Sequence, residues 1–376
     1  MILFSKSHID SEAILTESLN KLEAVKEQRV DGSDVTDLNP VALRCTLMDF
    51  ERNYQVKTLS KQLMSKNFSA FACSKLNPLF ISGLIDAEGS FTLVISKNQK
   101  RKSGWRTDAK FQIGLYKRDL DLLYLLQQSL EGIGNIHKDR IRNRVIYSID
   151  SIKDLTKLIL HIDNYPLLTQ KAADYILFKQ AIDLLKNKMH LTETGLNKFI
   201  DIKASMNKGL SDKLKLDFKQ YNVIQKPLTY ITDIPSIFWI AGFVSGDGCF
   251  DLRVMKTKTK TGYRVQLRFR ITQHIRDIKL MQSIISKLGC GAMYKYPKQK
   301  AVSIVVVDFS NITNIIIPLF DKYPIQGVKL YYYFRKALNW CSVHNLMANK
   351  QHLTVEGLKK IEKIKRFATG MNKTRK

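Results

Sequence analysis

The chain has 376 residues, of which 61 are Lys or Arg and 34 are Asp or Glu, so its formal net charge is +27. Hydrophobic residues make up 44% of the chain, which is typical of a folded protein and excludes a disordered polyelectrolyte. No apolar stretch approaches the roughly 18 to 20 residues of a membrane-spanning helix. The five cysteines lack the paired spacing of a zinc site or a disulfide framework.

The positive charge is confined to one part of the chain. Residues 1–75 hold ten basic and ten acidic side chains, so the whole excess of +27 falls on residues 76–376. A folded body that keeps such an excess usually binds a polyanion, with nucleic acid first and an anionic membrane surface second. A basic surface that binds nothing is the remaining alternative.

The chain contains two copies of one pattern. Residues 187–198 match residues 349–360 at eight of twelve positions, and Tyr165-Pro166 with Lys171 recurs as Tyr323-Pro324 with Lys329. Upstream, residues 82–91 align with residues 241–250. A repeat of about 160 residues is the size of a domain, so the sequence predicts a fused pseudo-dimer rather than a solenoid.

The expected elements follow the same order in both copies. A short apolar helix ends at Gly89 or Gly248, and alternating strands follow over residues 91–96 and 110–116, or 250–256 and 264–273. Asp119 and Asp277 are candidate N-caps of the next helix, which ends near residues 132–134 or 289–291. A second hairpin, a helix from about residue 169 or 328, and a last helix capped by Thr192 or Thr354 complete each copy.

These elements predict an α+β fold in which each copy has an antiparallel sheet backed by helices. The expected boundaries are an N-terminal extension over residues 1–75, a first domain over 76–208, a linker over 209–234 and a second domain over 235–376. The extension has no counterpart in the second copy and is expected to be a dispensable leader.

The paired apolar helices combine close packing with acidic chemistry. Gly83 and Ala87 share one helical face, as do Gly242 and Gly246, and small residues at this spacing let two backbones pack in contact. Packing of the helices against each other would bring the carboxylates that follow, Glu88 and Asp247, close together. Two carboxylates beside the negative ends of two helices repel unless cations neutralise them. Divalent metal and phosphodiester hydrolysis are the matching chemistry, whereas solvated helix-end acids are the alternative.

Residues 81–89 (ISGLIDAEG) and 240–248 (IAGFVSGDG) resemble the two signature helices of single-chain LAGLIDADG homing endonucleases. Nearly all of residues 76–376 shares the features that flank these helices in the family. The second motif departs from the signature at Ser245, where the family has Asp. The resemblance implies two LAGLIDADG domains related by a pseudo-twofold axis, with the motif helices packed at the domain interface.

The same resemblance implies a site-specific, Mg2+-dependent DNA endonuclease that cuts a long asymmetric target across the minor groove. It implies Glu88 and Asp247 as catalytic metal ligands, with two or more Mg2+ ions nearby, and the backbone carbonyls of Ala87 and Gly246 as further ligands. Lys171 and Lys329 match a basic position near the scissile phosphates. Gln273 matches a polar position near the attacking water, for which the first copy has Leu115.

Polar alternation along the expected strands indicates how DNA is read. Residues 264–272 place basic and amide side chains on one face and apolar side chains on the other, and Arg and Gln suit guanine and adenine edges in a major groove. The expected DNA-binding residues are Lys97, Arg101, Lys102, Arg106, Lys110, Gln112, Arg140, Arg142, Arg144, Arg253, Lys256, Arg264, Gln266, Arg268, Arg270 and Thr272. A solvated polar face is the alternative for any single strand. Because the two copies differ in these residues, we expect an asymmetric target and a monomer.

Two other functions share this scaffold. The chain could be a splicing maturase that binds its own intron RNA, or a DNA-binding regulator without catalysis, although the latter would be expected to lack one of the acids. The resemblance and a composition suited to an AT-rich genome favour an intron-encoded protein made inside a mitochondrion. The sequence shows no Arg-rich, acid-poor transit peptide.

Overall fold

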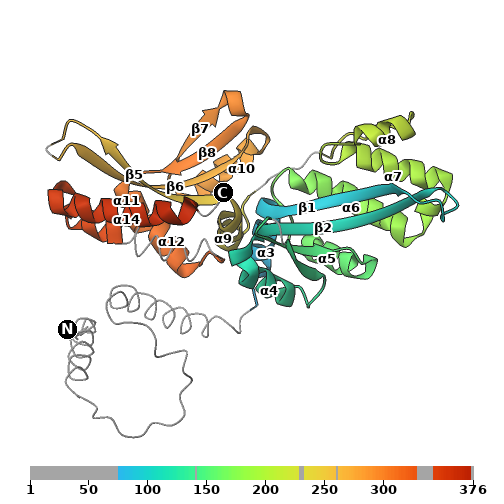
Figure 1. Ribbon diagram of the computed structural model, residues 1–376, viewed down its shortest axis with the longest axis horizontal. Helices are drawn as coiled ribbons and strands as arrows, with labels where there is room; N and C mark the ends of the chain where they lie inside the picture. The colour runs from blue at the N-terminus through green and yellow to red at the C-terminus, as the bar shows by residue number, and fades with distance from the viewer. Residues whose placement is uncertain (1–74, 140–141, 228–232, 260, 328–341, 374–376) are drawn as a thin grey trace, which may run out of the picture. The chain divides into compact units, whose positions relative to one another are not determined.

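A computed structural model describes residues 75–139, 142–227, 233–259, 261–327 and 342–373 of the chain. The residues from Ser74 onward belong to one unit, in which the same order of elements occurs twice (Figure 1). Apart from Lys75, the predicted leader lies outside the described residues, and so does Lys329.

The first half begins with a helix, and a sheet and further helices follow. Its elements are α3 (Pro78–Glu88), β1 (Gly89–Lys97), β2 (Trp105–Tyr116), α4 (Leu120–Ser129), β3 (Asn135–Asp139), β4 (Arg144–Ile149), α5 (Ile152–Asn164), α6 (Lys171–Lys186) and α7 (Glu193–Ser205). The strands form one antiparallel sheet in the order β1-β2-β4-β3.

The second half repeats this arrangement. Its elements are α9 (Ile237–Asp247), β5 (Gly248–Lys256), β6 (Tyr263–His274), α10 (Ile278–Leu288), β7 (Ala292–Tyr296), β8 (Ala301–Val306), α11 (Phe309–Asn311), α12 (Ile317–Lys322) and α14 (Val355–Lys373). Its sheet has the matching order β5-β6-β8-β7. The predicted α+β fold, a tandem of two sheets backed by helices, is therefore confirmed.

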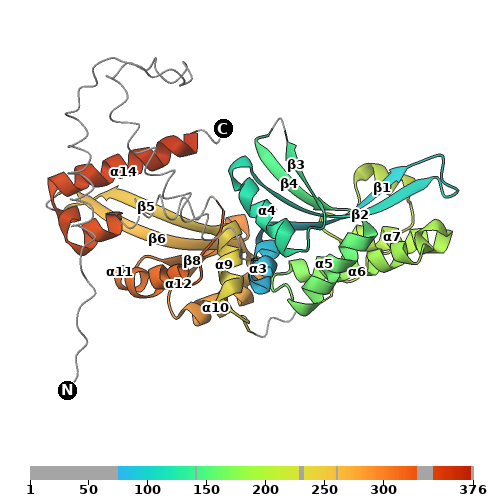
Figure 2. The same ribbon diagram turned by 90° about the horizontal axis from the view of Figure 1, so that it is seen from below.

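Each sheet has one face turned toward a hydrophobic core. Along β6, Val265, Leu267, Phe269 and Ile271 are buried, whereas the residues between them are partly or fully exposed. Helices cover the buried faces (Figure 2), and each half has its own cluster of buried apolar side chains. The alternation leaves the opposite face of each sheet to polar side chains.

The two motif helices are short and end at glycine. Asn77 caps α3 and Ser236 caps α9, each accepting a backbone N–H through its side-chain oxygen. Gly89 and Gly248 follow with φ of −68° and −71°, which any residue can adopt. A Cβ at Gly89 would lie 2.6 Å from the Ile85 carbonyl oxygen, so this glycine is needed for space rather than for backbone freedom.

α3 and α9 pack with their backbones in direct contact, as the spacing of small residues predicts. A methyl group on Gly83 would overlap the Trp239 carbonyl oxygen, and one on Gly242 would overlap that of Phe80. The helix pair lies between the two sheets in Figures 1 and 2. Only residues without a side chain allow this approach.

The predicted N-caps of α4 and α10 are wrong in their contacts. Asp119 and Asp277 occupy the N-cap positions, but neither side chain caps its own helix. Asp277 instead accepts a hydrogen bond of 2.7 Å from the backbone N–H of Gln170 in the other half. Local sequence favours a cap at these positions, and the docking of the two halves redirects the carboxylate.

The segment between the halves is more ordered than a linker prediction implies. It contains α8 (Asp212–Asp217), and Phe218 packs on Trp105 with ring centroids 4.6 Å apart. Further along, Lys226 forms an ion pair with Asp174 at 2.7 Å. Residues 211–227 therefore run along the first half before the chain enters the second.

Besides α8, two further helical regions escaped the sequence prediction. α5 follows β4 and is capped by Ser151, and residues 309–322 of the second half are helical after the Asp308 cap.

Among the described residues, no helix combines the length and apolar character needed to cross a bilayer.

Substitution Gly242→Ala tests the contact between α3 and α9. The added methyl group meets backbone atoms of Phe80 and Leu84, which cannot rotate away, so we expect a loss of about 3 kcal/mol in the free energy of unfolding. Urea unfolding monitored by circular dichroism measures this loss.

Gly262→Ala is the control, because its Cβ enters open space at a left-handed position (φ 71°) and should cost only about 1 kcal/mol of backbone strain. An equal, small effect of both substitutions would contradict the close backbone contact.

Candidate active site and nucleic-acid interface

Glu88 and Asp247 are the last residues of α3 and α9, and the helix contact brings them into one site. A Cβ at Gly246 would lie 2.9 Å from Cγ and 3.5 Å from Oε1 of Glu88, so the Glu88 side chain covers the residue that precedes Asp247. Both acids are partly exposed. The sequence predicted this convergence from the paired small residues.

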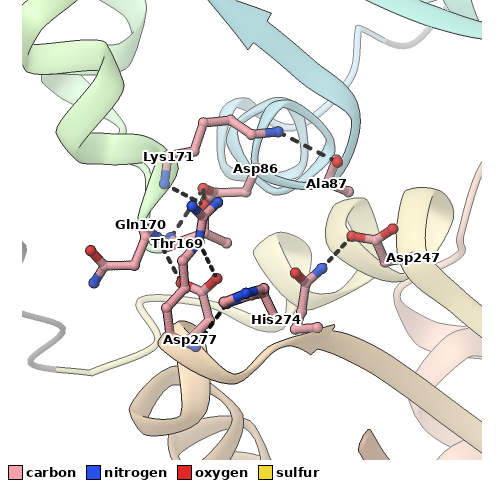
Figure 3. A network of polar contacts seen from close by, with 10 residues as sticks. Asp86, Ala87, Thr169, Gln170, Lys171, Asp247, His274 and Asp277 are labelled. Atoms are coloured by element: carbon pink, nitrogen blue, oxygen red, sulfur yellow. Dashed lines mark hydrogen bonds and ion pairs between the residues drawn. The ribbon is translucent and has the colours of Figure 1, made fainter. Parts of the chain in front are cut away.

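Lys171, the first residue of α6, lies at the C-terminal end of α3 and interacts electrostatically with both acids. Its ammonium donates hydrogen bonds to the carbonyl oxygens of Ile85 (3.0 Å) and Ala87 (3.4 Å) at the end of α3. Figure 3 shows the bond to Ala87. Burial lowers the pKa of this ammonium, while the charges of Asp86, Asp247 and Glu88 oppose that effect. The positive charge faces the negative end of the α3 dipole, where it is stabilising.

The two acids have different surroundings. Nε2 of Gln273 donates a hydrogen bond to Oδ2 of Asp247. Gly248 pairs with Ile271, and Gly89 pairs with Ile113, so Leu115 occupies in β2 the position that Gln273 has in β6. Leu115 packs against the first core cluster and cannot donate a hydrogen bond.

Asp86 is a buried hydrogen-bond acceptor at the contact between the halves. It accepts the backbone N–H groups of Leu168 (2.8 Å) and Thr169 (3.1 Å), the Thr169 hydroxyl (2.6 Å) and Nε1 of Trp239 (3.0 Å). Burial raises the pKa of its carboxyl against the opposing effect of these bonds. Asp86 thus fixes the segment that leads into Lys171.

Ser245 takes the corresponding place in α9. Its hydroxyl donates to the Ala241 carbonyl (2.8 Å) and accepts the N–H of Gln326 (3.0 Å), where Asp86 accepts the N–H of Leu168. Serine therefore reproduces one bond of the aspartate without its charge. The departure of the second motif at this position leaves Asp247 in place.

The structure places most of the predicted DNA-binding residues on the polar sheet faces or in turns. Arg106, Lys110, Gln112 and Arg144 alternate with buried residues of the first sheet. Arg264, Gln266, Arg268, Arg270 and Thr272 do so in the second, and Arg253 alternates with partly buried residues there. Arg101, Lys102 and Arg142 lie in hairpin turns, and Arg140 lies outside the described residues.

Lys97 and Lys256 are placed differently from the other basic residues. Lys97 pairs with Trp105 and Lys256 with Tyr263, which puts both at strand positions in phase with the core residues. Lys97 also forms an ion pair with Asp217 of α8 at 2.7 Å. Neither lysine therefore lies on the polar face of its sheet.

The sequence interpretation missed two polar contacts, one between neighbouring strands and one between the two halves. It assigned no partner to Asp251, which accepts hydrogen bonds from Arg268 across the β5–β6 pair. It also missed the bond between Asp277 and Gln170. The register of the β5–β6 hairpin could have indicated the first contact, but no local pattern indicates the second.

The donor set at the helix ends fits Mg2+. Within the described residues, no group of three His, Cys, Asp or Glu side chains is arranged to hold a metal. Two carboxylates and helix-end carbonyls remain, and Mg2+ commonly binds one or two carboxylates and completes its shell with water and phosphate oxygens. Lys171 shares the Ala87 carbonyl, so the carboxylates of Glu88 and Asp247 are the main candidate ligands.

The chain is similar to intron-encoded endonucleases of fungi. It is 50% identical over 373 residues to "Probable intron-encoded endonuclease 3" of Neurospora crassa. The alignment covers 95% of this chain and 69% of that protein. It is 36% identical over 342 residues to "Probable intron-encoded endonuclease 2" of the same organism, with 88% and 72% covered.

Solved structures with this fold include DNA complexes. The I-SmaMI LAGLIDADG homing endonuclease bound to cleaved DNA is 43% identical and has a TM-score of 0.75, with 81% of this chain and 99% of that one covered. The family described as LAGLIDADG endonuclease matches residues 81–182 and 240–344. The two matches contain most of each motif helix and all of each sheet, and the chain thus belongs to the LAGLIDADG endonuclease family.

Proposed function

We propose that this protein is a site-specific homing endonuclease that cuts both strands of a long, asymmetric duplex DNA target. The observation that carries the proposal is the convergence of Glu88 and Asp247 at the ends of two touching helices. These helices lie between two sheets whose polar faces carry arginine, lysine and glutamine side chains. The relatives named as endonucleases and the DNA complexes of similar structures support it.

We assign the two carboxylates to binding of Mg2+. When bound, the metal would supply an activated water and stabilise the leaving oxygen of the phosphodiester. Asp247 is oriented by Gln273, whereas Glu88 lies against Gly246. Lys171 holds a positive charge beside both acids, where it can attract a scissile phosphate. The corresponding role of Lys329 rests on the repeat.

The two polar sheet faces are assigned to base reading in successive major grooves. Arginine pairs with guanine and glutamine with adenine through paired hydrogen bonds. Turn residues such as Arg101, Lys102 and Arg142 are suited to phosphate contacts, which position the protein without reading sequence. Because both acids and both sheets belong to one chain, a monomer suffices and the target need not be palindromic.

The names of further relatives indicate where the gene lies. Several are named for introns of cox1 or ND4, and we propose that this chain is likewise encoded in an organelle intron, in a mitochondrion. Binding of its own intron RNA, as a maturase would require, is the second candidate, and no described contact favours it. The domain boundaries 76–208 and 235–376 and a dispensable leader remain part of the proposal.

Substitutions Glu88→Gln and Asp247→Asn test the metal-binding acids. Cleavage of a randomised duplex pool by the wild-type chain in Mg2+ first supplies the target. We then expect each variant to cut that target more than about a hundredfold slower, because loss of a partner of a metal ligand alone costs about 10- to 100-fold. A plasmid assay that separates supercoiled, nicked and linear DNA gives both rates.

Asp212→Asn removes a carboxylate whose side chain is 97% exposed on α8 and should cut at the wild-type rate. Ca2+ should allow binding without cutting, and EDTA should prevent cutting. Unchanged cleavage by either acid variant would exclude that acid from the reaction.

Substitutions at Gln273 and Leu115 test whether the two acids differ because only Asp247 has a hydrogen-bond donor at this position. Gln273→Leu removes the donor to Asp247 and makes this position equal to Leu115, so we expect cutting of one strand to slow by about tenfold. Strand-specific end labels would show a nicked intermediate that accumulates. Leu115→Gln is the matched variant in the first half. It should not slow the cutting of the DNA strand that Gln273→Leu affects. Equal slowing of both strands by Gln273→Leu would contradict the assignment.

A further inference from the structure

A cluster on the polar face of the second sheet contains an acid among basic side chains. Nε of Arg268 donates to Oδ2 of Asp251 at 2.9 Å, and Nη2 donates to the same oxygen. The Cys249 thiol donates to the other oxygen, Oδ1, at 3.1 Å, and Nη2 of Arg270 lies 3.9 Å from Oδ2. The Arg268 and Asp251 side chains are only 12% and 25% exposed.

The contact occupies one edge of the Arg268 guanidinium. Nε and one hydrogen of Nη2 are engaged by Asp251, and guanidinium has five N–H donors in a rigid plane. The remaining donors, on Nη1 and Nη2, form the end-on fork that matches O6 and N7 of guanine. Asp251 thus holds the plane of Arg268 in one orientation and does not itself engage that fork, and 12% of the Arg268 side chain remains exposed.

Asp251 is charged at neutral pH. Burial disfavours the ionised carboxylate, but the hydrogen bonds from Arg268 and Cys249 outweigh burial, and the pKa lies below the ordinary value. A carboxylate on a DNA-binding face repels phosphate, which weakens binding to unrelated DNA as well as to the target. A residue that weakens DNA binding in this way is expected to contribute to selectivity between DNA sequences.

The fold itself does not require this pair. Asp251 pairs with Arg268 in β5 and β6, and the corresponding cross-strand pair in β1 and β2 is Thr92 with Lys110. The same sheet forms in both halves with either pair. An acid at this cross-strand position is therefore particular to the second half.

We propose that Asp251 is a specificity-determining residue that positions Arg268 to read one guanine of the DNA target. The inference rests on the proposed function. Arg268 is three residues along β6 from Ile271, which pairs with Gly248 next to Asp247. Three residues of strand span about 10 Å. The guanine read by Arg268 therefore lies in the inner part of the second half-site, close to the cut positions.

Substitution Asp251→Thr, which installs the residue of the first half, tests the inference. A randomised duplex pool bound in Ca2+ gives the wild-type target, and titration of its single-base variants gives the preference at each position. We expect the preference for one inner guanine to fall about tenfold, the size of one bidentate arginine contact. Binding to unrelated duplex should strengthen severalfold, since one negative charge is lost.

Two further variants separate positioning from charge and from stability. Asp108→Asn makes the same charge change on the polar face of the first sheet, where Asp108 pairs with the more exposed Arg106 at 2.7 Å. It should strengthen binding to unrelated DNA but leave the inner guanine preference intact. In an Arg268→Ala background, Asp251→Thr should no longer alter base preference, because the acid acts through Arg268.

The outcomes distinguish this inference from the function on which it rests. A wild-type chain that selects no DNA sequence would overturn the proposed function and the inference together. A wild-type chain with a defined target whose guanine preference survives Asp251→Thr would overturn the inference alone. Weaker binding to target and unrelated DNA alike, with preference unchanged, would reduce Asp251 to a structural residue and also overturn it.

Discussion

The contact between the backbones of α3 and α9 determines where the chemistry of this protein can occur. Two helices come this close only if their facing residues lack side chains, and Gly83 and Gly242 meet that condition. The contact places the carboxyl ends of both helices side by side, together with Glu88 and Asp247. It also fixes the separation of the two sheets, since each sheet follows directly from its motif helix without a connecting loop.

This arrangement concentrates negative charge, and the surrounding residues offset part of it. Two carboxylates meet the negative ends of two helix dipoles, while Lys171 contributes a single ammonium nearby. Carboxylates that this ammonium does not neutralise are suited to a divalent cation. Asp86 holds Thr169, two residues before Lys171, within the first half. Two further bonds cross between the halves, one from Trp239 to Asp86 and one from Gln170 to Asp277. Asp86, which helps to dock the halves, thus lies two residues before Glu88, a proposed metal ligand.

The sequence predicted what depends on periodicity and repetition, and it failed where contacts join distant segments. The small-residue spacing in residues 81–89 and 240–248 indicated the helix contact, and alternation in residues 264–272 indicated the polar face. The N-cap role of Asp277 was wrong, because its local pattern is identical whether the carboxylate turns to its own helix or to Gln170. The ordered path of residues 211–227 depends on packing with Trp105, which no neighbouring residue encodes.

Fusion of two copies allows the halves to diverge while the contact between them is kept. Residues at the helix interface remain small in both copies, but Leu115 and Gln273 differ in polarity, and the pairs Asp86 and Ser245, and Thr92 and Asp251, differ in charge. A homodimer would change both copies of such a residue at once. In a single chain, each strand of DNA and each half-site meets its own set of side chains. Asymmetry near the acids would affect the order of cutting, and asymmetry on the sheets would affect the sequence that is read.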